Sequence, residues 1–188
     1  MKIINSLNED EWVSIKNIGT IFHLKKDQII FRKGEHNDKE VFLVNGIVRG
    51  FIIDENGSEK STSFFEEGEF MSTHSFRTQK SVSIYNYQAL CRTKLLVFDS
   101  KELKDLLSGT KKLHEIGKAI KEREMTRLMN RDDCLMQVKA LDKYQKFITF
   151  YPNLERQISQ RYIASYLGIT PVSLSRVKKS LLSQTDNN

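Results

Sequence analysis

Residues 160–181 read QRYIASYLGITPVSLSRVKKSL, and this stretch decides the fold class of the C-terminal part of the chain. Its apolar spacing predicts two short helices joined by a tight turn. Ala164 is a small residue at the point where two such helices would cross closely. Gly168 follows four positions later, where the turn needs a residue that tolerates a positive φ. Leu174 lies six positions beyond, and this spacing is that of a helix-turn-helix.

The second helix of this pair is expected to present its polar face to solvent. Thr170 can cap it, and Pro171 suits its first position because its missing N–H needs no partner there. A helix of this kind enters the major groove of DNA with its N-terminal residues on the base edges. The residues expected to read bases are Val172, Ser173 and Arg176, and those expected to contact phosphates are Thr170, Arg161, Lys178 and Lys179.

The charge distribution favours a polyanionic partner for the same part of the chain. The 188 residues carry 30 Lys and Arg against 24 Asp and Glu, which gives a formal net charge of +6. Residues 1–100 hold 13 basic and 14 acidic residues, whereas residues 139–188 hold eight basic and three acidic residues. The positive excess therefore lies mostly beside the predicted helix-turn-helix, as nucleic-acid binding would require.

The rest of the chain shows two other patterns. Residues 21–99 alternate short apolar runs with turn residues, and Asn45-Gly46 and residues 54–57 are interpreted as hairpin turns. Strands of this kind without crossover helices predict an antiparallel barrel or sandwich. After Asp99 the pattern becomes helical, and one long helix is predicted from Thr110 to Met136.

Composition argues against several classes of protein. No apolar run approaches the roughly 18 residues of a membrane span, and the start MKIINSLNEDEW lacks the apolar segment of a signal peptide. A cytoplasmic protein without membrane contact is therefore expected. Cys91 and Cys134 are too few for a disulfide framework or a four-cysteine iron–sulfur cluster. The four histidines are scattered and no nucleophile–base pair occurs, so we expect no metal, no cofactor and no enzymatic activity.

The order of a turn-rich β domain, a long helix and a helix-turn-helix resembles the Crp/Fnr family of bacterial transcription regulators. The stretches that carry the resemblance are VFLVNGIVRGFIIDENGSEKSTSFFEEGEFM, with Gly68-Glu69-Phe70 at the family's GDF turn, and ISQRYIASYLGITPVSLSRVKKSLL. The resemblance covers nearly the whole chain and implies an α+β fold. Residues 1–109 would form an antiparallel β-roll of the cyclic-nucleotide-binding type (a double-stranded β-helix). Residues 110–137 would form a long dimerisation helix, and residues 138–188 a winged-helix-like helix-turn-helix whose wing is short or absent.

The resemblance also shows where this chain departs from the nucleotide-binding members. Those members place a Glu on the ribose and an Arg-Ser pair on the cyclic phosphate, and the aligned positions here hold Thr73 and Ser83-Ile84. Since a bound phosphate needs a fixed cation, cyclic AMP is not expected in the usual mode. Lys80-Ser81 is the alternative to the Arg-Ser pair, and the identity of any effector stays open. The candidate pocket residues are Glu69, Phe70, Thr73, His74, Lys80, Ser81 and Ser83.

The resemblance leaves more than one function open. The first is a homodimeric regulator that binds a palindromic operator in double-stranded DNA, with RNA polymerase as a further partner. Its long helices would pair through Leu113, Ile116, Ile120 and Leu128. The second is an interaction or sensor module that has lost specific DNA binding. A cupin-like metalloenzyme is disfavoured because no His-x-His pair or metal-spaced cluster occurs.

Overall fold

The computed structural model describes residues 8–71 and 78–185 of the chain. The chain folds into two compact units, which we describe separately. The first unit consists of residues 1–50 and 64–126, and the second of residues 51–63 and 127–188. No helix within the described residues is long and apolar enough to cross a membrane.

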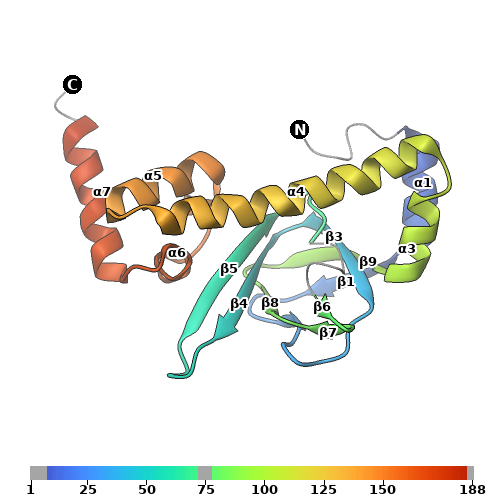
Figure 1. Ribbon diagram of the computed structural model, residues 1–188, viewed down its shortest axis with the longest axis horizontal. Helices are drawn as coiled ribbons and strands as arrows, with labels where there is room; N and C mark the ends of the chain where they lie inside the picture. Colours follow the sequence, from blue (N-terminus) through green and yellow to red (C-terminus); the bar gives the residue numbers. More distant parts are fainter. Residues whose placement is uncertain (1–7, 72–77, 186–188) are drawn as a thin grey trace. The chain divides into compact units, whose positions relative to one another are not determined.

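The first unit is an antiparallel β-roll (Figure 1). Its sheets have the strand orders β1-β9-β3, β2-β8-β4-β5 and β6-β7. The strands are β1 (Thr20–Leu24), β2 (Ile29–Phe31), β3 (Lys39–Asn45), β4 (Ile47–Ile53), β5 (Glu59–Glu66), β6 (Thr78–Gln79), β7 (Val82–Ser83), β8 (Asn86–Ala89) and β9 (Thr93–Asp99). In the first sheet, Ile21 of β1 and Phe42 of β3 both lie opposite Leu96 of β9, and both pairings are antiparallel. This roll and the helices that follow it confirm the predicted fold class.

The interpretation of Asn45-Gly46 as a hairpin turn is wrong. The strands on either side, β3 and β4, lie in different sheets, so these two residues form a corner at which the chain changes sheet. Gly46 has φ +114°, and a Cβ built there would lie 2.5 Å from the hydroxyl oxygen of Thr93. Close packing against a residue far along the chain therefore requires the glycine.

The second predicted turn is a hairpin, and it closes β4 onto β5. Gly57 adopts φ +76°, and the Asp54 carboxylate accepts hydrogen bonds from the backbone N–H groups of Asn56 and Ser58. These bonds lower the pKa of Asp54 and fix the turn locally. The tip of this hairpin, residues 51–63, belongs to the second unit.

Three helices contribute to the first unit: α1 (Glu9–Asn17), α3 (Ser100–Leu107) and α4 (Lys111–Met136), of which α4 continues into the second unit. The N-terminus of α3 is capped by Asp99, whose carboxylate accepts from the N–H groups of Lys101 and Glu102. The Thr110 hydroxyl accepts from the N–H of Leu113 at the start of α4. The long helix therefore begins where the sequence predicted.

The core of the first unit contains three residues that the sequence analysis assigned to a dimer seam. Leu113, Ile116 and Ile120 are at most 6% exposed. They pack in one cluster with side chains of the roll, of α1 and of α3, among them Ile15, Phe42, Phe70, Phe98 and Leu103. Their spacing does mark the apolar face of α4, but that face lies on the protein's own core. The assignment of these three residues to a partner is therefore corrected.

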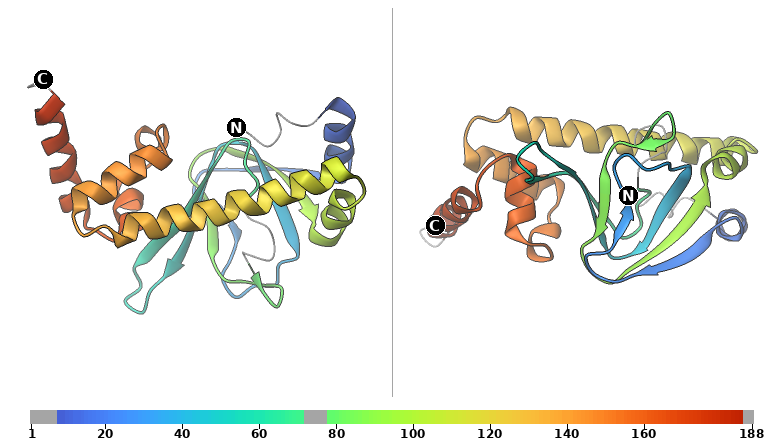
Figure 2. Two further views of the ribbon diagram at one scale, coloured as in Figure 1. Left: turned by 45° about the horizontal axis from the view of Figure 1, so that its top comes forward. Right: turned by 90° about the horizontal axis from the view of Figure 1, so that it is seen from below.

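The second unit is helical apart from the hairpin tip (Figure 2). Its elements are the C-terminal part of α4, α5 (Ala140–Phe150), the 3₁₀ turn η2 (Leu154–Arg156), α6 (Gln160–Leu167) and α7 (Pro171–Thr185). The rings of Phe147, Tyr151 and Tyr166 form its centre, with centroids 5.2–6.0 Å apart. This aromatic cluster holds α5 against α6 and so positions the helix pair predicted from the sequence.

Candidate functional site

Helices α6 and α7 form the predicted helix-turn-helix. Gly168 ends α6 with φ +64°, the left-handed conformation that the turn requires. The N–H of Ile169 donates to the carbonyl of Ala164 at 3.0 Å, which closes the turn. Ala164 and Leu174 are fully buried where the two helices meet. The local sequence therefore fixes this turn, as the spacing predicted.

The N-terminus of α7 is built by the two residues expected there. Pro171 is its first residue, and the Thr170 hydroxyl accepts from the N–H of Ser173 at 3.1 Å. The hydroxyls of Thr170 and Ser173 also hydrogen-bond to each other at 2.9 Å. Both predicted DNA-contacting hydroxyls thus serve first as parts of the helix cap.

The outer face of α7 presents Val172, Arg176 and Lys179 to solvent. Val172 is 60% exposed. The Arg176 guanidinium is exposed and forms no hydrogen bond or ion pair with any described residue. This side chain is the one on α7 that is most readily available to a ligand with hydrogen-bond acceptors.

Two of the predicted phosphate contacts are already engaged within the second unit. The Lys178 ammonium lies 2.5 Å from a carboxylate oxygen of Glu155 in η2. Burial alone would raise the pKa of Glu155, but hydrogen bonds from Lys178 and Tyr144 outweigh it and hold that pKa below its usual value. The Arg161 guanidinium lies over the Tyr162 ring at 4.6 Å and donates to the Tyr162 hydroxyl at 2.6 Å. Both cations therefore also hold the fold of this unit together.

Sequence reasoning missed two contacts that position the helix pair. The Lys143 ammonium donates to the carbonyl of Leu167 at 3.2 Å and so stabilises the C-terminus of α6. The Ser165 hydroxyl donates to the carbonyl of Glu59 at 2.8 Å and accepts from the N–H of Ser61 at 2.9 Å. Through Ser165, the tip of the β4–β5 hairpin is bonded to α6. No local sequence pattern marks either contact, because the partners are far apart along the chain.

The candidate pocket residues that the structure describes have different surroundings. Thr73 and His74 lie outside the described residues. Glu69 is held by Arg123, whose guanidinium donates to it at 2.8 and 3.1 Å. Phe70 belongs to the core and is 7% exposed.

The alternative to the Arg-Ser pair, Lys80-Ser81, lies in a tight turn. Lys80 and Ser81 both adopt a positive φ, +51° and +61°, and form the two-residue turn between β6 and β7. Ser83 is 1% exposed and its hydroxyl donates to the carbonyl of Tyr85 at 2.8 Å. The family alignment places position 83 beside the cyclic phosphate. In this structure the Ser83 hydroxyl is already bonded to a backbone carbonyl.

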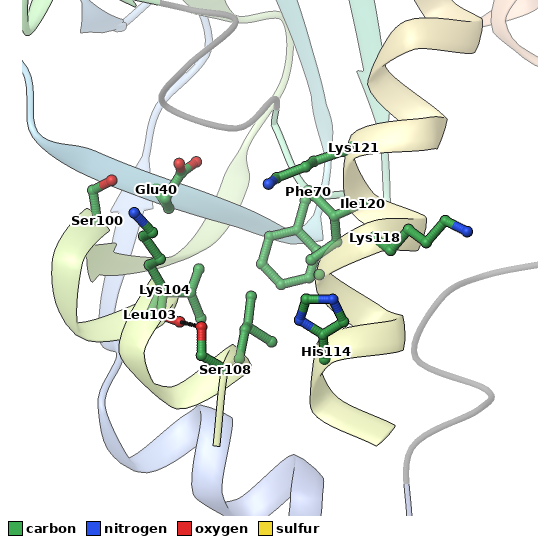
Figure 3. A pocket seen from close by; sticks show the side chains of 12 residues that line it. Glu40, Phe70, Ser100, Leu103, Lys104, Ser108, His114, Lys118, Ile120 and Lys121 are labelled. Carbon is green, nitrogen blue, oxygen red and sulfur yellow. Dashed lines mark hydrogen bonds between the residues drawn. The ribbon is translucent and has the colours of Figure 1, made fainter. Parts of the chain in front are cut away.

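A cavity of about 570 Å³ lies elsewhere in the first unit, between α3, α4 and β3 (Figure 3). Of the predicted pocket residues that the structure describes, Phe70 alone lines it. Its polar lining includes Lys104 of α3 with His114 and Lys121 of α4. Among the described residues, no group of three or more His, Cys, Asp or Glu is placed to hold a metal ion.

Comparisons with known proteins match this architecture. Residues 21–110 match the cyclic nucleotide-binding domain family. The match covers the β-roll and α3 and ends just before the long helix α4.

The regions beyond this domain also have relatives. The chain is 24% identical over 187 residues to the anaerobic regulatory protein of Pasteurella multocida (strain Pm70), which covers 92% of this chain and 67% of the relative. The solved structure of a CooA mutant from Carboxydothermus hydrogenoformans has a TM-score of 0.77 at 14% identity and covers 98% of this chain and 84% of that one. A putative transcriptional regulator of the Crp/Fnr family from Eubacterium rectale has a TM-score of 0.69 at 16% identity, with 98% and 88% covered. The predicted resemblance to the Crp/Fnr regulators is confirmed.

Proposed function

We propose that this chain is a homodimeric transcription regulator that reads a palindromic DNA site with helix α7. The observation that carries the proposal is the exposed Arg176 guanidinium on the outer face of a capped helix. Its planar fork can bond the O6 and N7 atoms of a guanine in the major groove. The exposed Lys179, one turn along, suits a phosphate.

The exposure and the contacts of each side chain define the roles within α7. Val172 is exposed near the N-terminus of the helix and suits contact with a thymine methyl group. Ser173 and Thr170 bond to each other, so they contribute to DNA binding mainly by fixing the helix N-terminus, whose N–H groups favour a phosphate. Lys178 is half-buried beside Glu155 whereas Lys179 is exposed, so Lys178 contributes less than Lys179.

The dimer of the proposal pairs the C-terminal part of α4 with its twin. In the second unit, Leu128, Met129 and Met136 are 37%, 64% and 80% exposed. Exposed apolar side chains that recur along one helix favour an apolar partner, and a twofold-related copy supplies one. A dimer would present two copies of α7 to half-sites about 34 Å apart, which matches a palindrome with one helical turn between its halves.

The proposal includes a sensor domain that does not take cyclic AMP in the usual mode. It rests on the engaged Ser83 hydroxyl and on the use of Lys80 and Ser81 as a tight turn. Isothermal titration calorimetry of the full chain with cyclic AMP should show no binding at micromolar concentrations. A micromolar affinity for cyclic AMP would contradict the proposal for the sensor domain and would leave the proposal for DNA binding unchanged.

The test of DNA recognition is a selection of bound sequences from random duplexes, followed by titration of the preferred sequence and a scrambled one. Arg176→Ala should lose about 1–3 kcal/mol on the preferred sequence and little on the scrambled one. Lys179→Ala should weaken both equally and reduce the slope of log affinity against log salt by about one. Lys178→Ala is the matched control on the same helix, and it should change affinity less than Lys179→Ala does.

Two results would contradict the proposal. One is a chain that binds no duplex of any sequence at low salt, which would favour an interaction or sensor module instead. The other is an Arg176→Ala variant that keeps the sequence preference of the parent. A monomer at all micromolar concentrations would remove the palindromic site from the proposal.

A further inference from the structure

The cavity between α3, α4 and β3 has the size of a small-molecule site. Its volume is about 570 Å³, and ligand pockets in proteins span roughly 300–1,000 Å³. All of its lining residues belong to the first unit. It lies away from Ser83 and from the β6–β7 turn, where the family resemblance places the cyclic phosphate.

One side of the cavity is apolar. Phe70, Leu103 and Ile120 line it and are 7%, 4% and 4% exposed, so their positions are fixed by the core. Gly117 of α4 leaves room beside them, because a Cβ built there would meet only Leu107, at 3.6 Å. An apolar body can therefore enter without displacing the core.

The mouth of the cavity carries two cations that form no ion pair within the part of the chain that the structure describes. Lys104 of α3 and Lys121 of α4 are exposed, and neither ammonium forms a hydrogen bond or an ion pair with any described residue. In Figure 3 both side chains point along the cavity, with the imidazole of His114 below Phe70. Lys118 is different: it points away in the same view and lies 3.6 Å from Glu122.

One buried carboxylate limits the positive charge. Glu40 of β3 lines the same cavity and is 8% exposed. With Lys104, Lys118 and Lys121, it gives the lining a formal net charge of +2. A carboxylate in the lining repels a doubly charged phosphate more than a singly charged anion, so the site suits a monoanion.

The geometry points to a binding site for a small carboxylate with an apolar body. The carboxylate lies between the Lys104 and Lys121 ammonium groups, and the body packs on Phe70, Leu103 and Ile120. This site rests on the cavity alone, and it holds whether or not helix α7 binds DNA.

The test uses the full chain and the fluorescent monoanion 8-anilinonaphthalene-1-sulfonate as the probe. Octanoate and phenyl phosphate are the competitors, one a singly charged carboxylate and the other a doubly charged phosphate. The probe should bind with enhanced emission, its affinity should fall with added salt, and octanoate should displace it at lower concentration than phenyl phosphate. Displacement in the opposite order would overturn the assignment of a carboxylate.

Two pairs of variants locate the site. Lys104→Gln with Lys121→Gln should weaken probe binding about tenfold or more, as expected for the loss of charge-assisted contacts. The control, Lys101→Gln with Lys111→Gln, removes the same charge from exposed positions of the same two helices and should change affinity less than about twofold. Gly117→Leu fills the cavity and should abolish binding, whereas Gly117→Ala should retain it.

Near-ultraviolet circular dichroism shows whether each variant keeps its packed core. If Gly117→Leu keeps the native spectrum and still binds the probe with parental affinity, the cavity is not the site. Equal loss of binding in the two double-lysine variants would show only long-range attraction and would overturn the assigned contacts.

Discussion

Helix α4 carries two sets of apolar residues with opposite surroundings. In the first unit, Leu113, Ile116 and Ile120 face inward and are at most 6% exposed. In the second unit, Leu128, Met129 and Met136 face outward and are at least 37% exposed. Apolar periodicity therefore shows that a helix has a face to cover, but it does not say whether the cover comes from the same chain.

The largest effect should follow from shortening a side chain in the inward part. Ile116→Ala removes buried methyl groups from the core cluster and should destabilise the protein by about 2–5 kcal/mol. Chemical denaturation measures this loss. Met129→Ala, in the outward part of the helix, is the control and should stay within about 0.5 kcal/mol when the protein is measured as a monomer, below its dimer dissociation constant. Equal losses would erase the difference between the two parts.

The next effect concerns association. Leu128→Glu with Met129→Glu places like charges on both copies of the proposed seam and should raise the dimer dissociation constant about a hundredfold or more. Sedimentation equilibrium measures it, and the midpoint of monomer unfolding should change little. Val138→Glu adds a charge just beyond α4, at a residue that is 96% exposed, and should leave the dimer intact. A dimer that survives the double change would mean that the seam lies elsewhere.

Features that depend on neighbouring residues could be predicted from the sequence, and features that depend on distant residues could not. The turn at Gly168, the Thr170 cap and Pro171 were all predicted correctly, because each depends on residues within one turn of the helix. The prediction of a hairpin at Gly46 was wrong, because the glycine is required by close packing against Thr93, which lies in another strand. The same limit applies to Lys178, whose partner Glu155 belongs to a different element.

The cavity in the first unit shows more clearly what the sequence could not predict. His114, Lys118 and Lys121 recur at spacings of four and three, so the sequence already places them on one side of α4. It gives no sign that Lys104 of α3 lies across from them. A charged helix face is usually solvated, and only the packing of α3 against α4 makes this one the edge of a cavity.

A smaller effect on stability is expected from the pH, and it tests whether one side of α4 is also buried in the second unit. Cys134 is fully buried there, and burial raises the pKa of its thiol to about 11. Since the unfolded chain would ionise this thiol near its usual value of 9.0, the free energy of unfolding should fall as the pH rises above about 9. Cys134→Ser should flatten that slope in denaturation curves measured between pH 8 and 10.

Thiol labelling gives an independent check. Cys91 is half-buried and should react with a maleimide before Cys134 does. Rapid labelling of Cys134 in the native protein would show that this part of α4 is not covered as described.

The smallest effect returns to the inward part of the helix. Gly117→Ala should stabilise the protein by about 0.5–1 kcal/mol, because alanine favours the helix and its Cβ meets Leu107 at an ordinary contact distance. Thermal unfolding measures the gain. A loss of stability would show that the packing of α3 against α4 is tighter than these distances indicate.

The Ser165 hydroxyl, bonded to both Glu59 and Ser61, bears on how this protein can be dissected. The polypeptide passes between the two units three times, at residues 50/51, 63/64 and 126/127, so neither unit is one continuous segment. An expressed fragment that starts at residue 138 would contain α6 and α7 but lack the strand pair that Ser165 holds. Truncation is therefore a poor way to test the proposed DNA binding, and point substitutions in the intact chain are the sounder tool.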